Sequence, residues 1–203
     1  MKRLVAALAV ILSTASIARA EIPNIMREGT HGMWAAGTMG VLAGIRDAKF
    51  NYQGITVRSD APTQFGLFQT FGYHFSGKPT GPAIAIDLQE GLGGDSDSVD
   101  IEIAFALVPK FVWDFRIIPG LGLYLSPMGG LGFMTVALDC NNCDNWNGFT
   151  FQFGFEGKLI LADRGMVFFR PFHLEFDIMK VPSVDEWGTY VRYGLLFGGG
   201  AIF

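Results

Sequence analysis

Hydrophobic and polar residues alternate one by one over residues 99–117. A period of two residues is typical of a β-strand whose two faces meet different surroundings. Charges on one face and large apolar groups on the other favour lipid on one side and a polar interior on the other. A soluble β-sandwich, which buries its apolar face, is the alternative. The apolar positions are Val99, Ile101, Ile103, Phe105, Leu107, Phe111, Trp113 and Phe115, and the opposing positions are Asp100, Glu102, Ala104, Ala106, Lys110, Asp114 and Arg116.

The same period recurs along most of the chain and predicts eight strands. The first strand has an ambiguous facing, because Met39 and Val41 compete with Trp34 and Leu42 for the apolar side. In the seventh strand, Phe168 is expected on the outer face. The strands are expected within residues 32–44, 63–75, 83–89, 99–117, 121–138, 149–161, 168–178 and 189–203.

The connections between these strands alternate in length. They run to roughly seventeen, six, eight, three or four, eight, four and nine residues, as in outer-membrane barrels with short periplasmic turns and longer outer loops. Residues 46–62 are expected to form the longest of them, a polar connection. We therefore predict an all-β fold, an eight-stranded antiparallel up-and-down transmembrane β-barrel with no exposed sheet edge.

Two uncharged stretches raise the alternative of membrane-spanning helices. Residues 117–138 contain Pro119 and Pro127, and an interior proline costs a helix about 3 kcal/mol. Residues 29–45 fall short of the ~20 apolar residues that a spanning helix needs. Strands of a closed barrel satisfy their backbone groups in lipid equally well, so we favour strands for both stretches.

The amino terminus has the pattern of a secretory signal peptide. Residues 1–20 combine a basic start, an apolar run and a small-residue cleavage site that ends at Ala20. We expect cleavage there, a short periplasmic leader over residues 21–31 and the barrel over residues 32–203. The signal carries three of the fifteen basic residues and none of the nineteen acidic ones, so the mature chain has a net charge of −7. This charge argues against a nucleic-acid partner.

The last fifteen residues, 189–203, alternate apolar and small positions and end on an aromatic residue, with Tyr193, Phe197 and Phe203 on one face. This segment resembles the closing strand of bacterial outer-membrane barrels, which the barrel assembly machinery reads. The mature chain as a whole resembles, more loosely, the small barrels of the OmpA, OmpX and OmpW kind. The resemblance implies the bacterial outer membrane as the location, its lipid and lipopolysaccharide as partners, and Tyr193, Phe197 and Phe203 as an assembly signal.

The inward face of the predicted barrel carries many charges. An eight-stranded barrel has room for little beyond its own side chains, and buried charges are costly unless they are paired. We predict an internal network of ion pairs with Arg192, Lys158 and Lys110 as the cations; a proton or ion path is the alternative. The predicted network comprises Asp87, Asp100, Glu102, Lys110, Asp114, Glu156, Lys158, His173, Glu175, Asp177 and Arg192.

Cys140 and Cys143 fall in an outer loop of an exported protein, where a disulfide is expected. The C-x-x-C spacing is also found in redox enzymes and zinc sites, but no second ligand pair accompanies it. The three histidines are dispersed, so no metal site or cofactor is expected. An acidic run over residues 95–100 is expected to be a solvated loop, with calcium binding as the alternative, because it lacks the spacing of an EF-hand.

We expect a non-enzymatic outer-membrane barrel with a structural role, a surface-interaction role or a small hydrophobic ligand. The alternative is a hydrolase of the lipid A deacylase kind, which would need His, Ser and an acidic residue at the outer leaflet. His74 and Ser76 are expected at the periplasmic rim, and no serine evidently accompanies His173. Apolar interior surface for a ligand is expected from Met128, Met134, Val136 and Leu196, beside the small Gly130, Gly132 and Gly194.

Overall fold

The computed structural model describes residues 31–46, 48–52, 55–59, 61–94, 101–118, 120–139, 144–162, 164–181 and 185–203. The predicted signal peptide, most of the leader, the acidic run over residues 95–100 and the cysteine pair Cys140 and Cys143 lie outside these residues. Their predicted roles therefore stay predictions.

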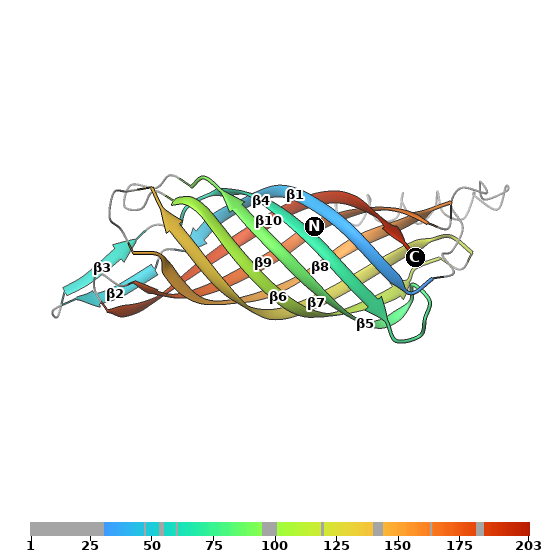
Figure 1. The fold of residues 1–203 in the computed structure, drawn as a ribbon, viewed down its shortest axis with the longest axis horizontal. Helices are drawn as coiled ribbons and strands as arrows, with labels where there is room; N and C mark the ends of the chain where they lie inside the picture. The colour runs from blue at the N-terminus through green and yellow to red at the C-terminus, as the bar shows by residue number, and fades with distance from the viewer. Residues whose placement is uncertain are drawn as a thin grey trace, which may run out of the picture.

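The described chain forms a closed barrel of eight antiparallel strands in the order β1-β10-β9-β8-β7-β6-β5-β4 (Figure 1). The predicted fold class is confirmed. Within the described residues, no helix is long and apolar enough to cross a membrane. The barrel strands are β1 (Met33–Arg46), β4 (Gln64–His74), β5 (Gly81–Leu92), β6 (Ile101–Arg116), β7 (Leu123–Leu138), β8 (Trp146–Leu161), β9 (Gly165–Val181) and β10 (Glu186–Ile202).

A second, two-stranded sheet was not predicted. β2 (Ala48–Tyr52) and β3 (Ile55–Ser59) pair as an antiparallel hairpin inside the connection that we expected to be an irregular polar loop. The hairpin extends past the barrel at the end opposite the C-terminus (Figure 1). β1 and β4 remain neighbours in the barrel, so the hairpin is an insertion between two paired strands.

The two ends of the barrel differ in their connections. The turn end holds the carboxyl terminus and the short connections 75–80, 117–122 and 162–164. The loop end holds the β2–β3 hairpin and the connections 93–100, 139–145 and 182–185. The last of these is shorter than the nine residues expected, because β9 runs on to Val181. Outer-membrane barrels have short turns in the periplasm, so the turn end is the periplasmic end.

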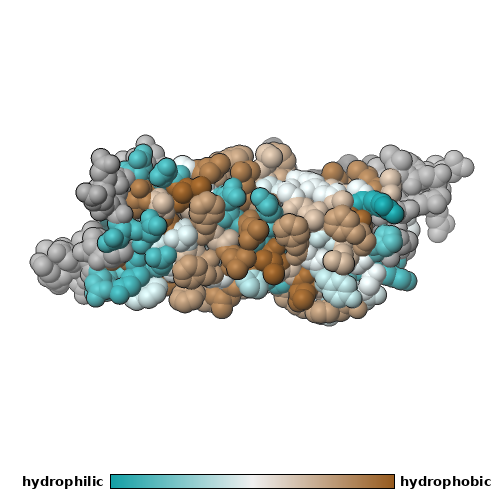
Figure 2. Space-filling view, viewed as in Figure 1, coloured by the Kyte–Doolittle hydropathy of each residue, from teal (hydrophilic) through white to brown (hydrophobic). Residues whose placement is uncertain are grey.

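The outer wall of the barrel is a belt of exposed aliphatic and aromatic side chains. Among them, Phe71, Phe133 and Phe153 are each more than half exposed. In Figure 2, hydrophobic residues gather over the middle of the barrel and hydrophilic ones at its loop end. A continuous apolar surface of this extent is unfavourable in water and matches the hydrocarbon core of a membrane.

The barrel resolves the ambiguous facing of the first strand. Trp34 and Leu42 are buried inside the lumen, whereas Met39 and Val41 are exposed on the wall. Trp34 lies against the neighbouring strand, where a side chain in place of Gly72 would collide with the indole. The strand is apolar on both faces, so its sequence alone does not indicate which face meets lipid.

A bulge near the start of β6 changes the facing of two residues. The pairing of β6 with β7 shifts register between Ile101 and Ile103. Ile101 is consequently buried in the lumen, while Glu102 is exposed. The prediction that Ile101 faces outward and Glu102 inward is therefore wrong. From Ala104 to Phe115 the predicted alternation holds, but Arg116, which was predicted on the inward face, is exposed at the end of β6.

A second bulge lies in β9. The register of β9 shifts against both neighbouring strands at the residues around Pro171. Proline cannot donate a ladder hydrogen bond, and within sheets it is found at bulges and edges. The extra residue places Phe168 and Arg170 inside the lumen on one side of the bulge, and His173 inside on the other. The outward facing predicted for Phe168 is therefore wrong.

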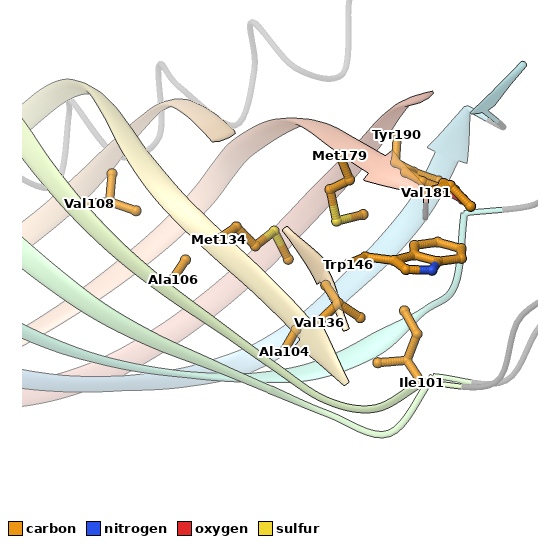
Figure 3. Close-up of a cluster of buried hydrophobic side chains, with 10 residues drawn as sticks. All are labelled: Ile101, Ala104, Ala106, Val108, Met134, Val136, Trp146, Met179, Val181 and Tyr190. Carbon is orange, nitrogen blue, oxygen red and sulfur yellow. The ribbon is translucent and has the colours of Figure 1, made fainter. Parts of the chain in front are cut away.

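Apolar side chains fill the lumen toward both ends. Near the turn end they include Trp34, Tyr124 and Phe168. Figure 3 shows the cluster near the loop end, whose side chains point into the interior from several strands. There the rings of Trp146 and Tyr190 stack with centroids 6.3 Å apart.

Candidate functional site

The candidate site is the charged interior of the barrel. Among the described residues, five carboxylates, four Lys or Arg side chains and two histidines are buried there. They form two groups. The turn-side cluster comprises His74, Asp87, Lys110, Asp114, Glu156, Lys158 and Arg170, and the loop-side cluster comprises Gln64, His173, Glu175, Asp177 and Arg192.

Asp114 organises the periplasmic half of the turn-side cluster. Lys158 Nζ lies 3.0 and 2.9 Å from the two carboxylate oxygens of Asp114. His74 Nε2 lies 2.6 Å from Oδ2 of the same carboxylate. The Lys158 ammonium also lies over the Trp34 ring, 5.0 Å from its centroid. One carboxylate thus holds together side chains from β4, β6 and β8.

Both ring nitrogens of His74 face acceptors. Nε2 meets the Asp114 carboxylate, and Nδ1 lies 3.0 Å from the backbone carbonyl oxygen of Gly32. A carbonyl oxygen and an ionised carboxylate can only accept hydrogen bonds, so both contacts require a proton on the ring nitrogen. The contact with Gly32 ties residue 32, just before β1, to the barrel interior.

Asp87 and Glu156 complete the turn-side cluster. Asp87 receives hydrogen bonds from Lys110 Nζ at 2.7 Å and from Thr70 Oγ1 at 2.5 Å. Arg170 lies between the two acids, with Nε and Nη2 each 3.2 Å from Glu156 Oε2 and Nη1 3.8 Å from Asp87 Oδ2. Every carboxylate of this cluster therefore contacts at least two donors, as buried charges require.

The loop-side cluster depends on one cation. Arg192 Nε lies 2.8 Å from Asp177 Oδ2 and Arg192 Nη2 lies 2.9 Å from Glu175 Oε2. Arg192 Nη1 also bonds to Gln64 Oε1. His173 Nε2 lies 2.8 Å from Glu175 Oε1, while His173 Nδ1 has no hydrogen-bond partner among the described residues.

Nine of the predicted network residues lie in these two clusters, and two do not. Asp100 lies outside the described residues, and Glu102 is exposed at the β6 bulge. Arg170, a fourth buried cation, was missed because the β9 bulge reverses its facing; Pro171, a proline inside a strand, was the available signal. His74, which was expected at the periplasmic rim, is the last residue of β4 at the turn end, and it is 2 % exposed. The nine are Asp87, Lys110, Asp114, Glu156, Lys158, His173, Glu175, Asp177 and Arg192.

The proposed assembly residues lie on the outside of the closing strand. Phe197 and Phe203 are about 60 % exposed on the lipid side, and Phe203 N donates to the carbonyl oxygen of Met33. The Tyr193 hydroxyl donates to the carbonyl oxygen of Pro171 at the β9 bulge. β10 thus closes the barrel by pairing with both β1 and β9.

One exposed ion pair joins the end of β9 to the connection that follows it. Lys180 Nζ lies 2.6 Å from Asp185 Oδ1 at the loop end, where both side chains are exposed. The hydrogen bond from Lys180 lowers the pKa of Asp185 below its usual value. An exposed pair of this kind contributes little to stability, unlike the buried pairs of the lumen.

Two small cavities are lined by lumenal side chains. One lies beside His74, Asp114 and Lys158, and the other beside Gln64, Asp177 and Arg192. Each has a volume of about 10 Å³, enough for roughly one water molecule. Neither can hold an acyl chain, although Met134 and Val136 supply apolar surface to the second one, as expected. In the described part of the chain, no three His, Cys, Asp or Glu side chains are arranged to hold a metal ion.

No protein-family model and no curated protein matches the chain. Several solved structures share its fold. The crystal structure of Neisserial surface protein A is 13 % identical, with a TM-score of 0.56 over 87 % of this chain and 100 % of that one. The outer membrane protein OprG from Pseudomonas aeruginosa is 13 % identical, with a TM-score of 0.51 over 88 % of this chain and 99 % of that one.

At this level of identity the likeness concerns the fold. The fold defines a class, the small eight-stranded barrels of the outer-membrane type, and the resemblance inferred from the sequence is confirmed. The apolar wall requires a lipid environment, and the closed barrel leaves no unpaired sheet edge within it. The chain therefore has the fold of a transmembrane β-barrel of the outer-membrane type.

Proposed function

We propose that this protein is a sealed, non-catalytic outer-membrane barrel that acts through its surfaces. One observation carries the proposal: apolar side chains fill both ends of the lumen, and the charges between them are engaged in ion pairs. A pore needs a continuous aqueous path. An interior filled in this way favours a structural or surface-interaction role.

The structure gives little support to a lipid-modifying hydrolase. His74 and His173 are buried in the lumen, away from the lipid wall. Neither ring forms a hydrogen bond with a Ser, Thr or Cys side chain among the described residues, whereas a serine nucleophile needs its base within hydrogen-bond reach. Ser76 is exposed in the β4–β5 turn, where its hydroxyl donates to the carbonyl oxygens of Lys78 and Thr80.

The surface that this function would use is the loop end. The β2–β3 hairpin lengthens this end beyond the barrel while β2 keeps contact with β10, so the hairpin is well placed to meet a partner. Outer-membrane lipid and lipopolysaccharide are the expected surroundings. The barrel assembly machinery is the expected partner during insertion, through Tyr193, Phe197 and Phe203.

The test combines conductance with surface labelling. Purified protein in planar bilayers should give no ion conductance above the lipid background, because the lumen is filled. On intact cells, Arg58→Cys in β3 should react with a membrane-impermeant maleimide, since Arg58 is exposed in the hairpin at the loop end. Steady conductance through single channels would overturn the sealed-barrel proposal.

The matched control is Lys78→Cys, exposed in the β4–β5 turn at the opposite end. It should react only after the outer membrane is permeabilised. Both variants need Cys140→Ser and Cys143→Ser to remove the native thiols. Labelling of Lys78→Cys on intact cells, with protection of Arg58→Cys, would reverse the orientation and place the hairpin in the periplasm.

A further inference from the structure

The lipid-facing wall is hollowed on one side of the barrel. A groove with a volume of about 750 Å³ crosses β4, β5, β6 and β7. Its size lies within the ~300–1,000 Å³ of small-molecule sites, although it opens on the outside of the barrel. Met33 and Tyr73, near the turn end, mark one limit of the groove, and Gly129 and Leu131 on β7 mark the other.

The groove arises between two rows of outward side chains. In one row, Tyr73 pairs with Ile84, Ile84 with Phe111, and Phe111 with Gly129. The other row contains Phe71, Ile86 and Pro109. Gly129 has no side chain and Pro109 has a short one, whereas most outward positions carry large groups. The wall is therefore hollowed at these two residues.

The position of the groove indicates its occupant. It lies within the apolar belt, toward the periplasmic end, and its rim is formed by apolar and aromatic side chains. Four strands spaced ~4.8 Å apart give the groove a length of roughly 14 Å, the scale of an extended acyl chain rather than of a folded domain. Because the surrounding lipid is equally apolar, retention must come from close packing in the groove.

A charge lies beyond the periplasmic end of the groove. Lys78 is exposed in the turn that joins β4 and β5. Tyr73, near the end of β4, lines the groove, so this turn follows the periplasmic end of the groove. A lysine ammonium at the membrane surface attracts lipid phosphate. An apolar furrow followed by a cation matches the order of groups in a phospholipid.

We propose that this wall groove holds one acyl chain of a phospholipid from the periplasmic leaflet, with the lipid phosphate at Lys78. The site is independent of the lumen and of the hairpin. It would hold one lipid at a fixed place on the barrel, whereas the other lipids of the surrounding shell exchange freely.

The chain offers a matched pair of variants for the test. A Cβ atom added at Gly129 would meet its nearest neighbour, Phe153 Cδ1, at 3.6 Å, an ordinary contact. A Cβ at Gly37, an outward glycine on β1 away from the groove, would meet nothing within 4 Å. Both Gly129→Phe and Gly37→Phe should therefore fold, which heat-dependent gel mobility checks, but only Gly129→Phe fills the groove.

The measurement is native mass spectrometry of protein released from detergent micelles doped with palmitoyl-oleoyl phosphatidylethanolamine. Wild type and Gly37→Phe should retain one phospholipid, and Gly129→Phe should retain roughly tenfold less, because the ring occupies the packing space. Lys78→Gln should lower retention by about fivefold, because the phosphate loses its counter-charge.

Three results would overturn the proposal. Equal retention by Gly129→Phe and Gly37→Phe would make the groove ordinary lipid-facing surface. Retention of detergent in place of phospholipid would remove the role of Lys78. Light scattering that finds a wild-type dimer and a Gly129→Phe monomer would make a second copy of the chain the occupant.

Discussion

The two clusters inside the barrel differ in how their buried carboxylates are paired with cations. In the turn-side cluster, three carboxylates face three Lys or Arg side chains, and the ring of His74 adds a further contact to Asp114. In the loop-side cluster, two carboxylates share the single guanidinium of Arg192. The Lys and Arg side chains thus equal the carboxylates in number on the turn side, whereas carboxylates exceed them by one on the loop side.

The difference follows from the number of strands that supply cations. The turn-side cations come from β6, β8 and β9, so each carboxylate keeps a partner when one cation is lost. The loop-side cation comes from β10 alone. Removing one partner of a buried pair leaves an uncompensated charge, which is more costly than never burying the pair. The loop-side cluster should therefore be the more sensitive of the two to loss of a cation, and the less sensitive to loss of a carboxylate.

Loss of Arg192 should have the largest effect. Arg192→Met should lower the free energy of unfolding by about 3–5 kcal/mol, because Glu175 and Asp177 both lose their cation. Urea titration of the protein folded in lipid vesicles measures the change. Arg164→Met, in the exposed β8–β9 turn, is the control and should change stability by less than about 0.5 kcal/mol. Equal stability of the Arg192→Met variant and wild type would remove the distinction between the clusters.

Replacing a carboxylate by an amide should destabilise the turn-side cluster more than the loop-side cluster. Asp114→Asn should cost about 2–3 kcal/mol, since Lys158 and His74 lose a charged acceptor. Asp177→Asn should stay within about 1 kcal/mol of wild type, because it removes a surplus negative charge while Arg192 keeps Glu175. The same urea titration compares them. If Asp177→Asn were the more damaging variant, the charge balance assigned to the two halves would be incorrect.

Loss of one turn-side cation should have a smaller effect than loss of Arg192. Lys110→Met should cost about 1–2 kcal/mol, because Asp87 keeps the hydroxyl of Thr70 and the guanidinium of Arg170. A double variant with Arg170→Met should then lose more than the two single costs combined, since Asp87 would have no cation left. Strict additivity in this double-mutant cycle would show that Arg170 does not support Asp87.

The fold was predictable because lipid imposes one rule on every strand. Side chains that face hydrocarbon must be apolar at every second position, so a period of two holds over the full length of β4, β5 and β8 and over β6 from Ala104 to Phe115. The inward positions of Asp87, Asp114 and Lys158 follow from that period alone. The closing strand and the number of strands were visible for the same reason.

The pairing of the charges was decided by the tertiary structure. Asp114 meets Lys158 and His74 only because the register of strands far apart in sequence brings β4, β6 and β8 to one level of a narrow lumen. The spacing of these residues along the chain does not predict their contacts. The sequence could name the charges that face inward, but it could not match the acids with the bases.

The sequence by itself determined the number of barrel strands, the membrane-facing surface and most of the inward charges, because each depends on a local period of two. Only the tertiary structure decided where that period breaks. One inserted residue reverses the facing of every side chain beyond it. The bulge at Pro171 brings Arg170 into the lumen, and the bulge near Ile101 turns Glu102 out. Bulges depend on the neighbouring strands, so the composition of the charged interior is a property of the closed barrel.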